Sequence, residues 1–252
     1  MTMTTARDVT TIGRIRHDEA MRLAAAENAK FATLLHAIAP ADWSKPTDCA
    51  LWDVRAMAAH VVGSAAGQVS PREFLRQKRK GKPVTAEIGG QFWWDGMNEV
   101  QVRERADLTP DQLIVEWETT YPKAVKARTK LPRFIANRRL LNLPIVGKQP
   151  VAYLFDVGFT RDVWMHRVDI ARALGYGLDF DAEHDGRLME DYVAEWASVY
   201  DVPFTLHLTG PAGGSFQRGE GGETVTIDAV EFLRTLAERE HGVGLLSNPL
   251  PL

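Results

Sequence analysis

The stretch VAYLFDVGFTRDVWMHRVDIARALG, residues 151–175, carries most of the information about the fold. Its apolar residues recur every three or four positions and Gly175 follows the last of them, which predicts one long helix with a left-handed glycine cap. Because residues three and four apart share a helix face, one face holds Phe155, Phe159, Asp162, His166, Asp169 and Ala173. Both ends of that face are apolar, so we expect it to point into the protein.

The three polar side chains in the middle of this face need partners. Buried polar groups without partners are costly, and Asp162 and His166, four residues apart, can bind one metal ion from a single helix face. Asp169 lies one turn further on and can orient a ligand. The same spacing also occurs on helices that bind no metal, and Asp169 can simply pair with an arginine. The spacing suggests a metal site and leaves a structural role open.

A second informative stretch is WDVRAMAAHVVGSAAG, residues 52–67. Asp53 can cap a helix that runs to about residue 68, because its carboxylate can accept the free N–H groups of the first turn. On this helix His60 lies among mostly small residues, which leave room for another helix or for a cavity: Ala56, Met57, Gly63, Ser64 and Gly67. His60 can therefore supply a third metal ligand, although a hydrogen-bonded core histidine is the simpler alternative. Two imidazoles and one carboxylate suit catalytic zinc or another divalent transition metal.

The remaining N-terminal sequence is mostly helical in pattern. Residues 12–38 and 91–106 have helical periodicity, and Thr109-Pro110-Asp111 is a good start signal for a helix that runs to about residue 130. The basic stretch RQKRKGKP, residues 76–83, predicts a solvated loop, and the proline-containing residues 131–150 predict irregular structure. We read four or five helices over residues 1–178, with Trp43, Trp52, Trp93, Trp94, Trp117 and Trp164 as core residues.

The C-terminal part has a different character. FTLHLTG, residues 204–210, alternates apolar and polar residues, and ETVTI, residues 223–227, predicts a second strand. The glycine-rich residues between them predict a turn, and residues 228–240 return to helical spacing. The fold class is therefore mainly α with a small α+β part: a helical domain over 1–178 and a small α/β domain over 179–252.

Composition excludes several classes of function. The 252 residues include 30 basic and 33 acidic side chains, so a net charge of −3 provides no general attraction for nucleic acid or an anionic membrane. The single cysteine, Cys49, cannot form an internal disulfide, and a reducing cytoplasm is the simplest location. We see no signal peptide and no apolar window long enough to span a membrane. Nucleotide-binding glycine motifs and serine-hydrolase motifs are also absent from the sequence.

Three segments resemble one known family. DWSKPTDCALWDVRAMAAHVVG, residues 42–63, is similar to the N-terminal signature of the mycothiol-dependent maleylpyruvate isomerase family. RDVWMHRVDIARALG, residues 161–175, resembles its second signature, and VTIDAVEFLRTLAER, residues 225–239, resembles the end of its C-terminal domain. The resemblance implies a DinB-like four-helix bundle followed by a small domain similar to sterol carrier proteins.

The resemblance also implies a set of site residues. A divalent metal, described as zinc in the family, is expected on His60, Asp162 and His166. A C-terminal arginine is implicated in catalysis, and we assign it to Arg234, with Arg239 as the second choice. The chain departs from the family pattern in three places: Asp162 replaces the usual glutamate, Arg-Val follows His166 in place of Gly-Trp, and the last helix ends in Ala-Glu-Arg in place of Gly-Arg.

The function implied is that of a metal-dependent enzyme with a low-molecular-weight thiol, mycothiol, as cosubstrate. It isomerises a small electrophile or transfers the thiol to it, and its expected partners are these two small molecules, in a monomer or homodimer. Two alternatives remain open at this stage. One is a metal-dependent hydrolase that needs no thiol, and the other is a non-catalytic binding protein for an apolar ligand.

Overall fold

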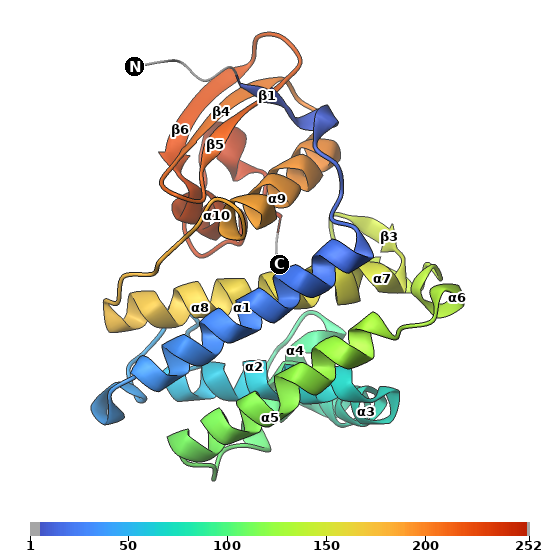
Figure 1. Ribbon diagram of the computed structural model, residues 1–252, viewed down its shortest axis with the longest axis vertical. Coiled ribbons are helices and arrows are strands. Elements are labelled where there is room, and N and C mark those ends of the chain that lie inside the picture. Colours follow the sequence, from blue (N-terminus) through green and yellow to red (C-terminus); the bar gives the residue numbers. More distant parts are fainter. Residues whose placement is uncertain (1–5, 251–252) are drawn as a thin grey trace. The chain divides into compact units, whose positions relative to one another are not determined.

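The computed structural model describes residues 6–250, which form two compact units (Figure 1). The helical unit comprises His17–Arg138 and Pro150–Gly177. The second unit contains the sheet and is assembled from the segment ending at Arg16, from Arg139–Gln149 and from the part that starts at Leu178. We expected the segment ending at Arg16 and the segment Arg139–Gln149 to belong to the helical domain, and the structure places both in the second unit. The protein is mainly helical with a small α/β part.

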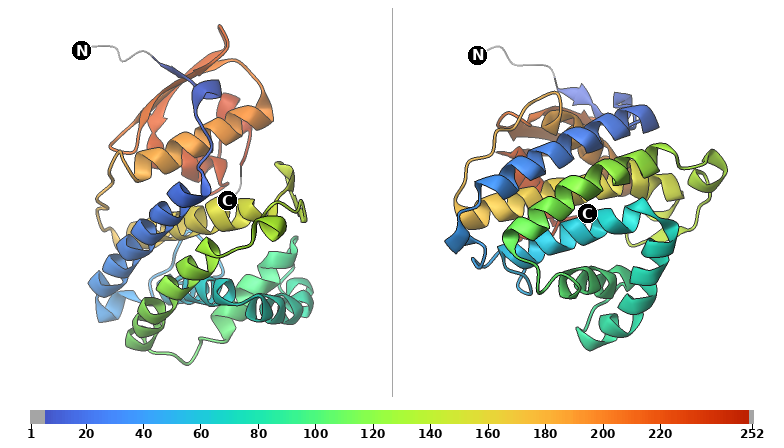
Figure 2. Two further views of the ribbon diagram at one scale, coloured as in Figure 1. Left: turned by 45° about the vertical axis from the view of Figure 1, so that its right-hand side comes forward. Right: turned by 60° about the horizontal axis from the view of Figure 1, so that its bottom comes forward.

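Four helices of the helical unit form a bundle (Figure 2). Both α1 and α2 pack against α5 and α8, so each helix has two neighbours in the bundle. The bounds of these helices are α1 His17–Ala37, α2 Val54–Val69, α5 Pro110–Thr129 and α8 Phe159–Leu174. The bundle core is formed by side chains that are fully or almost fully buried, among them Phe31, Leu35, Met57, Leu113 and Trp117.

The predicted start and stop signals of these helices are confirmed. The Asp53 carboxylate accepts the backbone N–H of Ala56 at 2.7 Å and caps α2. Thr109 and Gln112 form a capping box at the start of α5. Gly175 ends α8 with a φ of 70°, the left-handed conformation that glycine adopts without strain.

The prediction of a loop at residues 76–83 is wrong, because these residues lie in helix α3 (Pro71–Glu87). Ser70 caps this helix, and Pro71 occupies its first position. Helix α3 packs closely on α4 (Trp93–Arg103): a Cβ atom added to Gly96 would lie only 2.2 Å from the carbonyl oxygen of Gly81. The basic run is therefore the solvated side of a helix whose small residues face α4.

The segment between α5 and α8 contains only short elements. It begins with α6 (Arg133–Ala136) and the antiparallel hairpin of β2 (Leu141–Leu143) and β3 (Gly147–Gln149). The predicted helix over 151–175 then starts as α7 (Val151–Tyr153) and a π-helical turn, η3 (Leu154–Gly158), before α8. Most of the expected irregular structure is present, and the hairpin and the π turn were not predicted.

The second unit has a four-stranded sheet in the order β1-β5-β4-β6. Strand β4 pairs antiparallel with β5 and parallel with β6, and β1 pairs parallel with β5. The bounds are β1 Arg7–Asp8, β4 Phe204–Thr209, β5 Gly214–Arg218, β6 Glu223–Asp228, with helices α9 Asp185–Tyr200 and α10 Ala229–Leu236. Three short 3-10 turns complete the described elements: η1 Val9–Thr11, η2 Pro40–Asp42 and η4 Gly244–Ser247.

The prediction of a single glycine-rich turn between β4 and β6 is wrong, because strand β5 lies between them. The glycines at both ends form turns, whereas Phe216 in the middle is buried and lies opposite Leu206 of β4. The core of this unit is aromatic: Trp196 of α9 packs against Phe204 and Phe232, with ring centroids 5.2 and 5.5 Å away. Within residues 6–250, no helix combines the length and the apolar character that crossing a membrane requires.

Candidate metal centre

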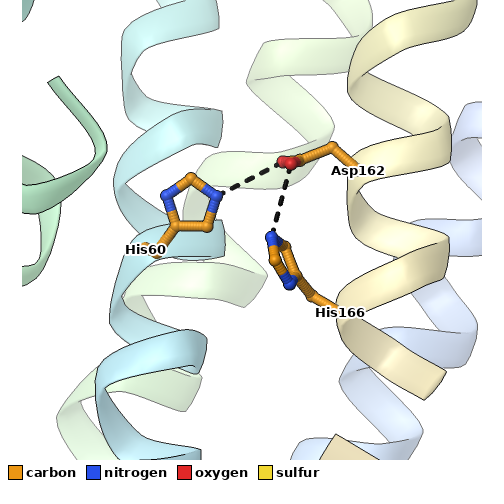
Figure 3. A group of neighbouring side chains, drawn as sticks. All are labelled: His60, Asp162 and His166. Atoms are coloured by element: carbon orange, nitrogen blue, oxygen red, sulfur yellow. Dashed lines mark ion pairs between the residues drawn. The ribbon is translucent and has the colours of Figure 1, made fainter. Parts of the chain in front are cut away.

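Two neighbouring helices of the bundle bring three potential metal ligands together (Figure 3). Helix α2 carries His60, and α8 carries Asp162 and His166 one turn apart. One ligand atom from each residue lies within 4.8 Å of the others. The carboxylate of Asp162 is between the two rings, with Oδ2 3.6 Å from Nε2 of His60 and Oδ1 3.4 Å from Nε2 of His166.

The centre is largely buried, yet one ligand reaches solvent. His60 and His166 expose only 2% and 8% of their surfaces. The side chain of Asp162 is 30% exposed. The centre therefore meets solvent through Asp162, while the two imidazoles are held inside the bundle.

The hydrogen bond of His60 determines which ring nitrogen is available. Its Nδ1 atom lies 2.8 Å from Oε1 of Gln101 on α4, so the ring donates its Nδ1 proton to this oxygen. Its Nε2 atom is then unprotonated in the neutral ring. Within residues 6–250, this buried Nε2 atom has no hydrogen-bond partner. A buried nitrogen lone pair beside a carboxylate is a costly arrangement that a bound cation would satisfy.

His166 is oriented from its other side by a second carboxylate. Oδ2 of the fully buried Asp169 lies 3.3 Å from Nδ1 of His166, one turn along α8. Among the described residues Nδ1 of His166 has no hydrogen-bond partner, so Asp169 acts on this ring through its charge, and Nε2 of His166 is directed toward Asp162.

The electrostatics of the centre favour a positive charge between these residues. Although burial disfavours its charged form, the carboxylates of Asp162 and Asp169 raise the pKa of His166 to about 9. Burial likewise disfavours the charged form of Asp162, but the protonated ring of His166, 3.4 Å away, holds the pKa of this carboxyl well below its usual range. Without a metal, the centre holds an Asp162 carboxylate and a protonated His166, and a divalent cation would take the place of that proton.

Sequence reasoning missed the role of Trp52, which we expected only as a core residue. Its indole stacks on the His60 ring, with centroids 4.9 Å apart and an angle of 26° between the planes. It also meets the His166 ring edge-on at 6.3 Å. Nε1 of Trp52 donates to Glu99 of α4 at 3.2 Å, which fixes the indole in this position. Its place directly before the cap residue Asp53 was the only signal in the sequence.

The donor set has the chemistry of a divalent transition-metal site. It offers two imidazole nitrogens and one carboxylate oxygen, and such three-residue sets leave coordination positions for a substrate or water. A divalent ion on one carboxylate keeps a net positive charge, which stabilises a thiolate at neutral pH. The residues present thus fit the metal that the sequence predicted.

The predicted catalytic arginine belongs to the other unit. Arg234 on α10 is almost fully buried, and its guanidinium pairs with Glu240 at 2.9 Å and with Glu231 at 3.4 Å. Arg239, the second choice, is half-buried and donates to the carbonyl oxygen of Ala237 at 3.4 Å. The guanidinium of Arg234 is thus held in place by carboxylates of its own unit.

Comparison with known proteins gives a consistent result. Residues 24–171, more than half of the chain, match the family described as the mycothiol maleylpyruvate isomerase N-terminal domain. The chain is also similar to a crystal structure of the mycothiol-dependent maleylpyruvate isomerase, at 17% identity and a TM-score of 0.59. A mutant of that enzyme with one histidine replaced by alanine gives 16% and 0.59. Both matches cover 94% of this chain and 97% of the other, so the fold is shared over nearly the whole length. No curated protein sequence matches the chain.

Proposed function

The chain belongs to the family of the mycothiol maleylpyruvate isomerase N-terminal domain, and from this we propose that it is a metal-dependent enzyme that acts through a low-molecular-weight thiol. Mycothiol is the proposed thiol and zinc the proposed metal. The reaction is isomerisation of a small electrophile or transfer of the thiol to it. The observation that carries the proposal is the convergence of His60, Asp162 and His166 from two helices on one point.

We assign a separate role to each residue of the metal centre. His60 and His166 bind through Nε2 and Asp162 binds through its carboxylate, after Nε2 of His166 has released its proton. Asp169 retains the proton on Nδ1 of His166 and so keeps that ring in the binding orientation. Trp52 covers the His60 ring and limits the access of water to it. The metal, when bound, supplies the positive charge that stabilises the thiolate.

For an isomerisation, the proposed reaction needs no net change in the thiol. The thiolate sulfur adds to a conjugated double bond, and the electron pair moves to the carbonyl oxygen as an enolate. The former double bond rotates as a single bond, the enolate re-forms the double bond, and the thiolate leaves. Arg234 stays the proposed catalytic arginine on the strength of the family resemblance, and its guanidinium, which is charged at physiological pH, is held by Glu240 and Glu231 of its own unit. The same groups would serve a thiol transfer in which the adduct is released. We propose a cytoplasmic location, where the thiol stays reduced.

The first experiment measures metal content by elemental analysis of the purified protein. We expect about one zinc ion per chain in the wild type and its loss in His60→Ala and His166→Ala. His36→Ala is the matched control, since this exposed histidine of α1 pairs with Glu118 away from the centre. No metal in the wild type after reloading with zinc would contradict the proposal and favour a binding protein for an apolar ligand.

Thiol dependence then separates the two enzymatic possibilities. Metal-loaded protein is assayed on electrophilic substrates and on esters, with and without added thiol. Turnover that requires the thiol supports the proposal. Turnover of an ester without thiol, lost in His166→Ala, would replace it with a metal-dependent hydrolase.

A further inference from the structure

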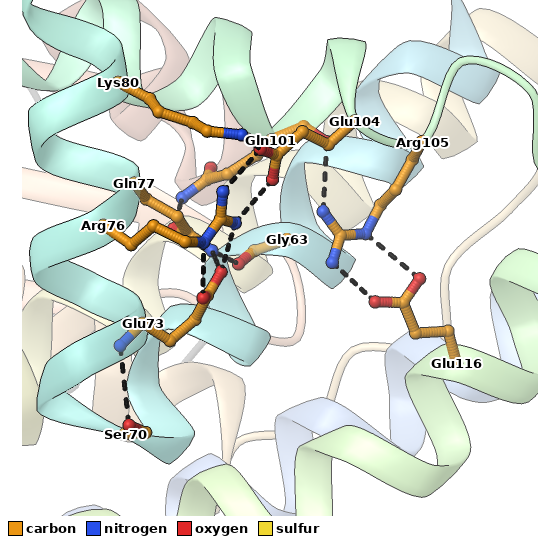
Figure 4. A network of polar contacts seen from close by, with 10 residues as sticks. All are labelled: Gly63, Ser70, Glu73, Arg76, Gln77, Lys80, Gln101, Glu104, Arg105 and Glu116. Atoms are coloured by element: carbon orange, nitrogen blue, oxygen red, sulfur yellow. Dashed lines mark hydrogen bonds and ion pairs between the residues drawn. The ribbon is translucent and has the colours of Figure 1, made fainter.

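Two buried glutamines, Gln101 and Gln77, continue the hydrogen bonding of His60 away from the metal centre. Figure 4 shows the part of this chain from Gln101 through Gln77 to Gly63 and Glu73. Gln101 of α4 accepts from Nδ1 of His60 at 2.8 Å. Its amide nitrogen donates to Oε1 of Gln77 on α3, also at 2.8 Å. The amide nitrogen of Gln77 in turn donates to the carbonyl oxygen of Gly63 and to Glu73, both at 3.0 Å. Three helices of the unit are thus joined by one polar chain.

A backbone carbonyl sets the direction of this chain. The oxygen of Gly63 can only accept, so the NH₂ group of Gln77 must face it and the Gln77 oxygen must face Gln101. The NH₂ group of Gln101 is then committed to Gln77, and only its oxygen is left for His60. Both glutamines are almost completely buried, so water does not compete for these groups.

The carboxylate of Glu73, at the end of the chain away from His60, reinforces this orientation of the Gln77 amide. Glu73 accepts from Gln77 and is held by Arg76, whose Nε and Nη2 atoms lie 2.7 and 2.5 Å from its oxygens. Arg76 also pairs at 2.6 Å with Glu104, the residue directly after α4, which ties α3 to the end of α4. The Arg76 guanidinium holds the pKa of Glu73 below its usual value, so Glu73 stays an acceptor at neutral pH.

We propose that Gln101, anchored by Gln77, is a positioning residue that keeps the proton of His60 on Nδ1 and so leaves Nε2 free to bind the metal. The inference rests on the proposed function for the metal, but the tautomer of His60 exists in the metal-free protein and can be measured there. Without the Gln101 acceptor, the hydrogen-bond acceptor that remains beside the His60 ring among residues 6–250 is the Asp162 carboxylate, 3.6 Å from Nε2. The proton would then move to Nε2 and block the ligand position.

The glycines of α2 make room for this arrangement. A Cβ atom added to Gly63 would lie 2.5 Å from Cβ of Gln101, and one added to Gly67 would lie 2.8 Å from Oε1 of Gln77. The small residues that flank His60 in the sequence therefore accommodate the two glutamines. Their role is to admit the positioning residues from α3 and α4.

The test compares Gln101→Met with Gln101→Glu. Methionine has a similar shape and only a weakly accepting sulfur, whereas glutamate keeps an acceptor oxygen for Nδ1 of His60. Long-range ¹H–¹⁵N NMR of the metal-free protein at pH 8 reports the tautomer, and a chelator competition reports zinc affinity. We expect Gln101→Met to shift His60 to the Nε2–H form and to lower zinc affinity by about 10–100-fold. Gln101→Glu should keep the Nδ1–H form and most of the affinity.

The expected ranking of the two variants, with Gln101→Glu binding zinc better than Gln101→Met, distinguishes a positioning role of Gln101 from a packing role. If Gln101 only filled space, the apolar Gln101→Met would be tolerated at least as well as the buried charge of Gln101→Glu. Gln68→Met is the matched control, because this buried glutamine of α2 faces Ser64 at 3.4 Å and not His60. Thermal unfolding of each variant identifies any that fails to fold, and Gln77→Met then provides a second break in the chain.

The tautomer measurement tests the inference about Gln101, and zinc binding by the wild type tests the proposed function, so the two can fail independently. A Nδ1–H tautomer that survives in folded Gln101→Met or in folded Gln77→Met, with unchanged zinc affinity, would overturn the inference and leave the metal site intact. If the wild type binds no zinc, the proposed function fails, and the inference about the tautomer is still decided by the NMR measurement on the metal-free protein.

Discussion

The imidazole rings of His60 and His166 stand almost perpendicular to each other, at 87° with centroids 5.0 Å apart. They come from different helices, and their Nε2 atoms approach opposite oxygens of the same carboxylate. Neither ring covers the other, so both nitrogens are directed at one region of space. The relative position of α2 and α8 therefore determines the geometry of the centre.

Zinc affinity should rise with pH up to about 9. Because the pKa of His166 is raised to about 9 and zinc binds the unprotonated ring, the ion must displace a proton below that pH. We expect the apparent affinity to increase by about tenfold per pH unit between pH 6.5 and 9 and then to level off. Calorimetry in buffers of different ionisation enthalpy should detect proton release at pH 7. Release that is equal in wild type and His166→Ala would contradict this assignment.

The metal-free protein should lose stability over the same range. The folded pKa of His166 lies above its ordinary value of 6.5, so its ion pair with Asp162 contributes fully below pH 6.5 and is lost as the pH rises toward 9. We expect a decrease of a few kcal/mol in the free energy of unfolding, measured by urea denaturation with a chelator present. The difference between wild type and His166→Ala isolates this contribution, and parallel curves for the two proteins would rule it out.

Two substitutions of Asp162 should show whether zinc affinity depends on the charge of this side chain or on its length. Asp162→Asn keeps the size of the side chain but removes its negative charge, so we expect zinc affinity to fall by more than about tenfold. Asp162→Glu restores the residue usual in the family, and the partial exposure of this side chain leaves space for it, so binding should persist. Asp111→Asn, at an exposed position of α5, is the control. Equal binding by Asp162→Asn and wild type would remove Asp162 from the ligand set.

Arg167, which stands where the family usually has glycine, forms a buried ion pair with Glu27 of α1 at 2.5 Å. We expect Arg167→Met to lower the free energy of unfolding by about 3–5 kcal/mol, because Glu27 would stay buried without this cation. Arg103→Met is the comparison, since Arg103 pairs with Glu87 at the surface, and such pairs contribute about 0–1 kcal/mol. Similar effects of both substitutions, measured by chemical denaturation, would show that burial does not matter here.

The crossing of α3 and α4 should tolerate no side chain at Gly96. The added methyl group of Gly96→Ala would overlap Gly81 and Thr85, so we expect a loss of about 1–3 kcal/mol or a separation of the two helices. Gly177→Ala is the control, because a Cβ atom there meets nothing within 4 Å. Thermal unfolding of both variants provides the measurement, and equal midpoints would argue against the close crossing.

Local signals predicted the helices of the bundle well, and contacts between helices explain most of what was missed. Asp53, Thr109 and Gly175 act on their own turns, so their roles can be read without knowledge of the fold. Periodicity likewise indicated which residues of α8 share the face of Asp162. The functions of Trp52, Gln77 and Gln101 depend on neighbours from other helices.

One wrong prediction concealed the chain behind His60. With residues 76–83 taken as a loop on the strength of their charge, Gln77 had no reason to lie inside the protein. In the sequence, the start of this helix is indicated by Ser70 as the cap and Pro71 at the first helical position. Strand β5 was missed for a similar reason, since the glycines on both sides obscured the single buried Phe216.

The pairing of β1 with β5 has a consequence for synthesis on the ribosome. Arg7 and Asp8 are synthesised before their partners Phe216 and Gln217, which follow more than two hundred residues later. The entire helical unit is made in between, so β1 must wait until it is complete. Until β5 is made, β1 has no partner strand, and its backbone N–H and C=O groups are open to pairing with another chain. An insertion between β1 and β5 would prolong that interval, whereas a fusion partner before β1 would not change it.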